Sequence, residues 1–129
     1  YTNYETQIAP ARTFCLLSEV TELAKQGLIK GGNIGNAVVI VDRDIDGEEV
    51  KFFKEKFGIK FYQGSRGLYK SQQLRFKNEP VRHKTLDLIG DLALLGKPIR
   101  GHVTAIKSGH KGNVEFAKLL RKEFKDQFK

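Results

Sequence analysis

A single long helix, bounded by its own sequence signals, constrains the fold of this chain more than any other feature. Pro80 suits the first turn of a helix, where its missing N–H would have no partner, and Gly96 and Pro98 close the segment. Apolar residues between these limits cover much of the helix circumference: Val81, Leu86, Leu88, Ile89, Leu92, Leu94 and Leu95. A helix with so broad an apolar surface is typical of a protein interior. We therefore predict a central helix at 80–95.

Strand-like and helix-like segments alternate before this helix. Residues 11–17 favour a strand, Ser18 favours an N-cap, and a helix is expected to follow at 19–26. The β-branched run at 37–41 indicates a short buried strand, and apolar residues at helical spacing predict a second helix at 48–57.

The remaining segments complete the fold class. Residues 61–77 indicate a loop with a short strand. Apolar and polar residues alternate at 99–106 as they do in a strand, and a last helix is expected from near Asn113. This alternation predicts an α/β (α+β) fold: a two-layer sandwich of a small mixed sheet with helices packed on one face, plus a strand–helix–strand insert. We expect residues 1–129 to form a single domain.

Composition excludes several other classes. With 40% hydrophobic and 29% charged residues, the 129-residue chain is globular in composition. Its longest apolar runs are far short of the ~20 residues that span a bilayer. Cys15 is the only cysteine, so no internal disulfide can form, and no segment resembles a signal peptide. We expect a cytoplasmic protein. Because the chain starts at Tyr1 and lacks methionine, we also expect it to be a piece of something longer.

The net charge of +8 favours anionic partners, whether nucleic acid, phosphorylated metabolites or acidic lipid surfaces. A basic phosphate- or nucleic-acid-binding module is one class that this charge allows, although the chain lacks the interleaved aromatic residues of a base-stacking surface. The basic segment 118–129 indicates a solvated helix face instead, because apolar residues recur in it at helical spacing.

An acidic segment at 42–47 matches the first half of a calcium-binding loop. Such a loop needs a bidentate glutamate at its twelfth position, which is Phe53 here, and a preceding helix, whereas 37–41 is expected to be a strand. We therefore interpret the segment as an acidic turn before a helix.

His83 and Asp87 form a stronger candidate site. Their separation of four residues places them on one face of the predicted helix, and Asp91 lies one turn farther along that face. An imidazole nitrogen and a carboxylate oxygen could together bind one divalent cation, and both are acceptable zinc ligands. The alternative is a surface ion pair worth at most ~1 kcal/mol.

His110 is the next candidate, at the end of a Lys-Ser-Gly-His turn before the last helix. A histidine in such a turn can act as a general acid or base, with a carboxylate such as Asp91 orienting it. The alternative is an exposed loop histidine.

Several segments occur together in the order of one enzyme family: IAPARTF at 8–14, GL at 27–28 with KGG at 30–32, NEPVRHKTLDLIGDL at 78–92, LG at 95–96, PI at 98–99 and KSGH at 107–110. The chain resembles the C-terminal domain of UDP-3-O-acyl-N-acetylglucosamine deacetylase. That family is the zinc amidase of the committed step of lipid A synthesis in Gram-negative bacteria. The resemblance covers nearly the whole chain apart from 42–73, and 42–77 is then a variable insertion.

The resemblance implies a role for each matching position. His83 and Asp87 match two of the three Zn²⁺ ligands, and His110, with Asp91 as its partner, matches the histidine that stabilises the oxyanion and protonates the leaving amine. The implied substrate contacts are Lys84 and Lys107 at the nucleotide diphosphate and sugar, and Thr13 and Phe14 beside the glucosamine. The strand–helix–strand unit at 11–41 is implied to form a passage for the acyl chain, lined by Val20, Ile29, Ile34 and Val39.

The family's third zinc ligand, a histidine, and its general-base glutamate lie in an N-terminal domain that has no counterpart here. We therefore expect the chain to supply about half of an active site and to be inactive alone. The resemblance also implies a UDP-acyl-N-acetylglucosamine substrate, the N-terminal domain as a partner, and, in some members, a fused hydroxyacyl carrier-protein dehydratase, with no nucleic acid. A purely structural domain with a surface His83–Asp87 ion pair is the remaining alternative.

Overall fold

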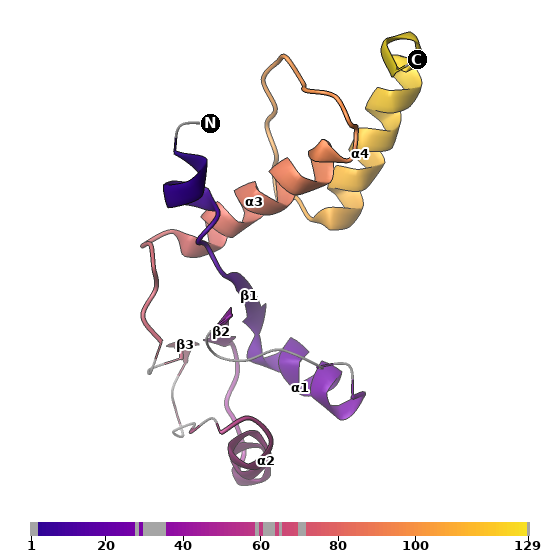
Figure 1. Ribbon diagram of the computed structural model, residues 1–129. Coiled ribbons are helices and arrows are strands. Elements are labelled where there is room, and N and C mark those ends of the chain that lie inside the picture. The colour runs from indigo at the N-terminus through magenta and orange to yellow at the C-terminus, as the bar shows by residue number, and fades with distance from the viewer. Residues whose placement is uncertain are drawn as a thin grey trace. The chain divides into compact units, whose positions relative to one another are not determined.

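A computed structural model describes residues 3–27, 29, 36–58, 60, 64, 66–69 and 72–128 of the chain (Figure 1). They belong to two compact units: a helical unit (residues 1–11 and 78–129) and a sheet unit (residues 12–77). The helical unit contains the π-helix η1 (Tyr4–Ile8), helices α3 (Glu79–Ala93) and α4 (His110–Glu123), and the 3-10 helix η2 (Lys125–Phe128). The sheet unit contains β1 (Thr13–Leu16), α1 (Leu17–Lys25), β2 (Ala37–Val41), α2 (Gly47–Phe57) and β3 (Gly67–Leu68).

The sheet unit has a three-stranded mixed sheet in the order β1-β2-β3. Strand β1 runs parallel to β2, with Thr13 opposite Ala37, and β3 runs antiparallel to β2, with Leu68 opposite Ile40. Because β1 and β2 are parallel, a crossover must join them, and α1 lies in it. The predicted α+β class is therefore confirmed, including its small mixed sheet and the strand–helix–strand segment.

Helix α2 contributes the centre of the apolar core of this unit. Phe53 is fully buried and packs with buried side chains from α1, β2 and the loops: Leu17, Val39, Val41, Ile45 and Tyr69. Asp46 caps α2 by accepting the Glu49 N–H at 2.8 Å, and Gly58 ends the helix with a left-handed φ of 67°. Helix α2 is thus bounded by local signals and held by one buried aromatic side chain.

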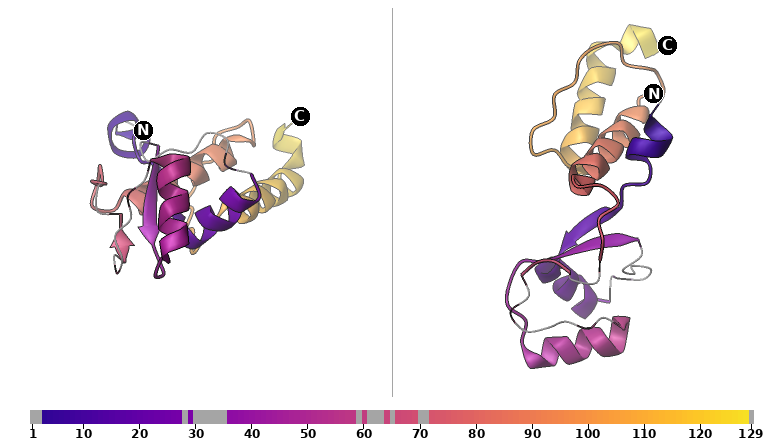
Figure 2. Two further views of the ribbon diagram at one scale, coloured as in Figure 1. Left: turned by 90° about the horizontal axis from the view of Figure 1, so that it is seen from below. Right: turned by 90° about the vertical axis from the view of Figure 1, so that its left-hand side faces the viewer.

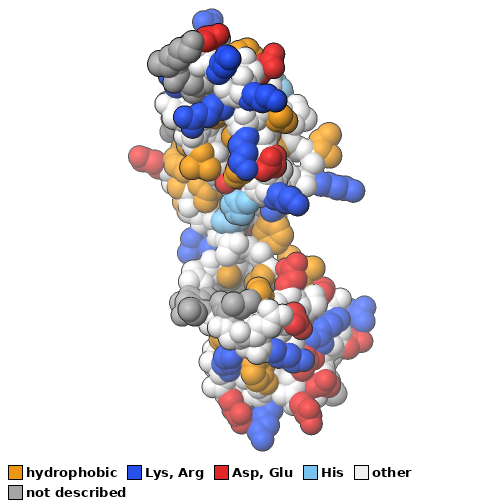
Figure 3. All heavy atoms as spheres, turned by 90° about the vertical axis from the view of Figure 1, so that its right-hand side faces the viewer, with side chains coloured by type: hydrophobic (Ala, Val, Ile, Leu, Met, Phe, Trp, Pro, Cys, Tyr) orange, Lys and Arg blue, Asp and Glu red, His pale blue; other side chains and the backbone are white. Residues whose placement is uncertain are grey.

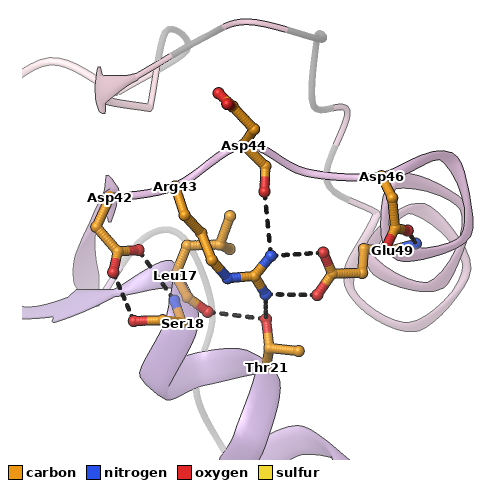
Figure 4. Close-up of polar contacts among 8 residues, drawn as sticks. All are labelled: Leu17, Ser18, Thr21, Asp42, Arg43, Asp44, Asp46 and Glu49. Atoms are coloured by element: carbon orange, nitrogen blue, oxygen red, sulfur yellow. Dashed lines mark hydrogen bonds and ion pairs between the residues drawn. The ribbon is translucent and has the colours of Figure 1, made fainter.

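The prediction that Ser18 caps α1 is wrong. Helix α1 begins two residues earlier than predicted, at Leu17, and the Glu19 carboxylate accepts the Leu16 N–H at 3.1 Å. Ser18 lies in the first turn, where its hydroxyl and its N–H donate to Asp42 at 2.6 and 3.1 Å (Figure 4). These hydrogen bonds, the one from the Ser18 hydroxyl above all, lower the pKa of Asp42. A carboxylate after β2 therefore satisfies a helix-terminal N–H that an N-cap side chain would otherwise bind.

Arg43 joins three segments of the sheet unit (Figure 4). Its guanidinium donates to both carboxylate oxygens of Glu49 at 2.5 and 2.7 Å, to the Thr21 hydroxyl at 3.2 Å and to the Asp44 carbonyl at 3.1 Å. The bidentate pair with Glu49 and the hydrogen bond to Thr21 together link α1 and α2 through the loop after β2. The Asp44 carboxylate pairs with Arg66 instead, at 3.0 Å. The carboxylates of the acidic segment 42–47 therefore make separate contacts: Asp42 accepts from Ser18, Asp46 caps α2, and Asp44 pairs with Arg66.

Replacing Glu49 with glutamine is expected to lower the free energy of unfolding of the sheet unit by about 1–2 kcal/mol at neutral pH, because it breaks a charge-assisted bidentate contact. The hydrogen bonds from Arg43 lower the pKa of Glu49. This contribution is therefore present above the ordinary glutamate pKa of about 4.3 and is lost as the pH falls through the lowered value. Urea denaturation at neutral and acidic pH measures both effects. The exposed Glu48→Gln variant is the control, and an equal loss in both variants would contradict the assignment.

In the helical unit, α3 and α4 lie side by side in every view (Figures 1 and 2). Pro80 stands in the first turn of α3, as predicted. The apolar circumference of this helix is only partly covered, since Val81 is 64% exposed and Leu94 is 66% exposed. Helix α4 and η1 contact α3 and leave these two side chains outside.

Two predictions for this unit are wrong. Residues 99–106 form no strand and belong to an irregular connection between α3 and α4 (Figure 1). An alternating segment becomes a strand only where a neighbour supplies ladder hydrogen bonds, and the described residues of the helical unit include no strand. Helix α4 begins at His110 rather than near Asn113, because the Gly109 carbonyl already accepts the Asn113 N–H at 3.0 Å.

Within the described residues, every helix is too short or too polar to cross a bilayer.

Candidate active site

Helix α3 places His83, Asp87 and Asp91 one turn apart on a single stripe, as their spacing predicts. The His83 Nε2 atom lies 3.3 Å from Asp87 Oδ1. Both side chains are largely enclosed, with 18% and 11% of their surfaces exposed. This burial distinguishes the pair from an ordinary solvated ion pair.

The backbone of the preceding segment sets the tautomer of His83. Its Nδ1 atom lies 3.0 Å from the carbonyl oxygen of Ala11. A carbonyl can only accept, so Nδ1 carries the proton and, in the neutral ring, Nε2 carries the lone pair that faces Asp87. A histidine ligand held through its other nitrogen by a carbonyl is the usual arrangement at metal sites.

The donor set of His83 and Asp87 fits zinc, which takes imidazole nitrogen and carboxylate oxygen in catalytic sites. In the part of the chain that the structure describes, no group of three or more His, Cys, Asp or Glu side chains is placed to hold a metal ion. This pair therefore offers two ligands, fewer than the three protein ligands of an ordinary catalytic zinc centre.

His110, the first residue of α4, reaches back to α3. Its Nδ1 atom lies 2.9 and 3.0 Å from the two carboxylate oxygens of Asp91, and its Nε2 atom lies 3.8 Å from Asp87 Oδ1. The hydrogen bond to Asp91 is the main reason that the pKa of His110 is raised, and the charges of Asp91 and Asp87 add to it. The protonated imidazole is thus favoured beside the His83–Asp87 pair.

Asp91 is held from a second direction by Asn113. The Asn113 side-chain amide donates to Asp91 Oδ2 at 2.9 Å. Burial opposes the ionised form of Asp91, yet the hydrogen bonds from Asn113 and His110 outweigh it and lower the pKa of Asp91. Sequence reasoning missed Asn113 and the Ala11 carbonyl, although a polar residue three positions after His110 on the same helix was an available signal.

The two predicted lysines lie differently around this group. Lys84 follows His83 on α3, and its Nζ atom lies 3.9 Å from Asp87 Oδ2. Lys107 adopts a left-handed φ of 49° in the turn before α4, a conformation uncommon outside glycine. Lys107 and His110 line the same hollow of about 710 Å³ beside α4.

The remaining predicted site residues belong to the sheet unit. Thr13 is exposed at the start of β1, and Phe14 is half-buried next to it. Val39 is buried in the apolar core, with the half-buried Val20 packed against it, and Ile29 is half-buried. Ile34 lies outside the described residues. Their roles in binding glucosamine and an acyl chain stay predictions.

A sequence model of the family described as LpxC, UDP-3-O-acyl N-acetylglycosamine deacetylase, matches residues 1–58 and 62–122. The chain is 50% identical over 119 residues to the bifunctional enzyme LpxC/FabZ of Chlorobaculum tepidum, covering 90% of this chain and 26% of that protein. It is 45% identical over 118 residues to the UDP-3-O-acyl-N-acetylglucosamine deacetylase of Chlamydia pneumoniae, covering 92% and 34%.

A third relative, the deacetylase of the same name from Leptospira biflexa, is 42% identical over 115 residues. The chain spans about a quarter to a third of the length of these curated relatives. The match to the family nevertheless extends over most of this chain, and it confirms the resemblance seen in the sequence motifs. The chain belongs to the UDP-3-O-acyl-N-acetylglucosamine deacetylase family.

Proposed function

We propose that this chain supplies part of the active site of a zinc-dependent deacetylase. The enzyme would hydrolyse the N-acetyl group of UDP-3-O-(3-hydroxyacyl)-N-acetylglucosamine in lipid A biosynthesis, in the cytoplasm. One observation carries the proposal: the His83–Asp87 pair, 3.3 Å apart, lies next to a second pair in which His110 contacts Asp91 at 2.9 Å. A metal-ligating pair beside a carboxylate-oriented histidine is the arrangement that metal-assisted amide hydrolysis needs.

His83 and Asp87 would hold the zinc ion through Nε2 and a carboxylate oxygen. When bound, zinc polarises a carbonyl oxygen and activates water for attack. His110, oriented by Asp91 through Nδ1, has Nε2 left to stabilise negative charge on the reacting oxygen and to donate a proton to the leaving amine. The hydrogen bond to Asp91 that raises the pKa of His110 favours this acid form. The third zinc ligand and the general-base glutamate would come from the family's N-terminal domain.

The other family positions complete the proposed substrate site. Lys84 and Lys107 would contact the nucleotide diphosphate and the sugar, and Thr13 and Phe14 would lie beside the glucosamine. The acyl passage would be lined by Val20, Ile29, Ile34 and Val39. Relatives named bifunctional LpxC/FabZ enzymes support a fused hydroxyacyl carrier-protein dehydratase as a partner.

A basic phosphate- or nucleic-acid-binding module is not favoured. The family match is to proteins named as deacetylases. On the face seen in Figure 3, Lys and Arg side chains lie over both units with acidic side chains among them, rather than in a single basic stripe as nucleic-acid binding would require.

The test of this function combines zinc titration with a deacetylase assay. The intact protein that carries this chain is expected to bind one zinc ion tightly, and His83→Ala should abolish both binding and activity because a ligand is lost. Residues 1–129 alone should bind zinc weakly and show no activity, since they offer two ligands and no general-base glutamate. Isothermal calorimetry and product release measure these outcomes.

His102→Ala is the matched control, because His102 is an exposed histidine of the connection before α4 and should leave zinc binding unchanged. Nanomolar zinc binding by residues 1–129 that is lost in His83→Ala, or deacetylation by this chain alone, would show that the proposed division of the site is wrong.

A further inference from the structure

Asn113 is a buried polar residue to which the proposed reaction gives no role. Only 4% of its surface is exposed, and its side-chain amide donates to Asp91 Oδ2 at 2.9 Å. It lies three residues after His110 on α4, so both donors to Asp91 come from the same face of one helix.

The His110 ring is held mainly by Asp91, at 2.9 Å, whereas the Asp87 carboxylate lies farther away, 3.8 Å from Nε2. Its side chain is 69% exposed, so packing restricts its rotation weakly. The contact that orients the ring is the one to Asp91, whose own side chain is 13% exposed. The orientation of the Asp91 carboxylate therefore determines which imidazole nitrogen faces Asp91 and which one is left for the substrate, and in the neutral ring it also determines which nitrogen carries the proton.

Asn113 fixes that carboxylate. Both Asn113 and His110 donate to Oδ2, and His110 also contacts Oδ1. An amide donor on one side keeps the carboxylate from turning away from the imidazole. We propose that Asn113 is a positioning residue: by holding Asp91, it keeps the Nδ1–H of His110 on that carboxylate, so that Nε2 faces the reacting groups and, in the neutral ring, the proton stays on Nδ1. The consequence for catalysis rests on the deacetylase function proposed above, whereas the tautomer itself does not.

A purely structural role for Asn113, as a tie between α3 and α4, makes a different prediction. In that case both Asn113→Asp and Asn113→Ala would lower the free energy of unfolding, and the folded protein would keep the wild-type His110 tautomer and the wild-type kcat. If Asn113 instead positions Asp91, a second carboxylate at this distance repels the first and displaces it. Asn113→Asp should then be at least as damaging as Asn113→Ala, although it preserves the shape of the side chain.

The experiment uses the intact protein that carries this chain, with histidine labelled in ¹⁵N. At a pH above the titration of the ring, the nitrogen shifts of His110 should report the Nδ1–H tautomer in the wild type. They should move toward the Nε2–H tautomer in both Asn113 variants, with His102 as an unchanged internal reference. Circular dichroism checks that α4 remains folded.

In the deacetylase assay, kcat should fall about 10- to 100-fold in each Asn113 variant while KM stays within about twofold, as for other residues that act through a neighbour. In an Asp91→Asn background, Asn113→Ala should cause no further loss. An unchanged His110 tautomer in both variants, or full activity of Asn113→Asp, would overturn the proposal. If the wild-type protein does not deacetylate the substrate, the proposed function fails and the tautomer measurement still decides the role of Asn113.

Discussion

Replacing His110 with alanine in the intact protein is expected to lower kcat for deacetylation by about 10²–10⁴-fold, the usual contribution of a general acid. His110 contacts Asp91 through Nδ1, and its Nε2 atom faces the side of α3 that carries the proposed zinc ligands. Removing the ring removes both the proton donor and the positive charge that would stabilise the reacting oxygen. Steady-state kinetics should show the loss in kcat with little change in zinc content.

Asp91→Asn should cause a smaller loss, about 10- to 100-fold, because it disturbs His110 without removing it. Glu115→Gln is the matched control, since Glu115 is a carboxylate of α4 that pairs with the exposed Lys118; its kcat should equal that of the wild type. Wild-type kcat in His110→Ala would exclude His110 as the acid.

Replacing Phe53 with alanine should lower the free energy of unfolding of the sheet unit by about 3–5 kcal/mol. Phe53 is fully buried among the core side chains, and its ring centroid lies 5.5 Å from that of Phe52 and 5.8 Å from that of Phe57. Its loss removes apolar burial and leaves a cavity between α2 and the sheet. A domain is typically stable by only about 5–15 kcal/mol, so this unit would be close to unfolding.

Urea denaturation followed by circular dichroism measures the loss, and amide hydrogen exchange in β2 assigns it to the sheet unit. Phe124→Ala removes an equal side chain that is 46% exposed, so it should cost less than about 1 kcal/mol. A loss in Phe53→Ala no larger than that of the control would contradict the position of Phe53 at the centre of the core.

The helices could be predicted because their signals are local. Pro80 and Gly96 bracket α3, and Asp46 and Gly58 bracket α2, through hydrogen bonds and backbone angles that involve a few neighbouring residues. Helical geometry alone then places His83 and Asp87 on one face. The sequence motifs added the family, which the comparisons bear out.

The cap of helix α1 and the strand at 99–106 could not be predicted so well, because helix capping and strand pairing can depend on residues distant in the sequence. Ser18 has the chemistry of an N-cap, yet it bonds Asp42, which is 24 positions away. Residues 99–106 have the alternation of a strand, yet the described part of the helical unit supplies no strand beside them. A local sequence pattern limits the conformations and contacts that a segment can adopt, and the neighbouring segments determine which of them forms.

The candidate site likewise combines features set by local sequence with contacts between residues distant in the sequence. The sequence by itself determined the stripe of His83, Asp87 and Asp91, since a helix repeats every 3.6 residues whatever surrounds it. The sequence also named Asp91 as the partner of His110, but only the tertiary structure decided that the Ala11 carbonyl sets the tautomer of His83 and that Asn113 donates to Asp91 beside His110. These contacts join residues 19 to 72 positions apart, and side-chain hydrogen bonds form only within about 3 Å. Packing of α4 and the N-terminal segment against α3 is what brings these groups within that range.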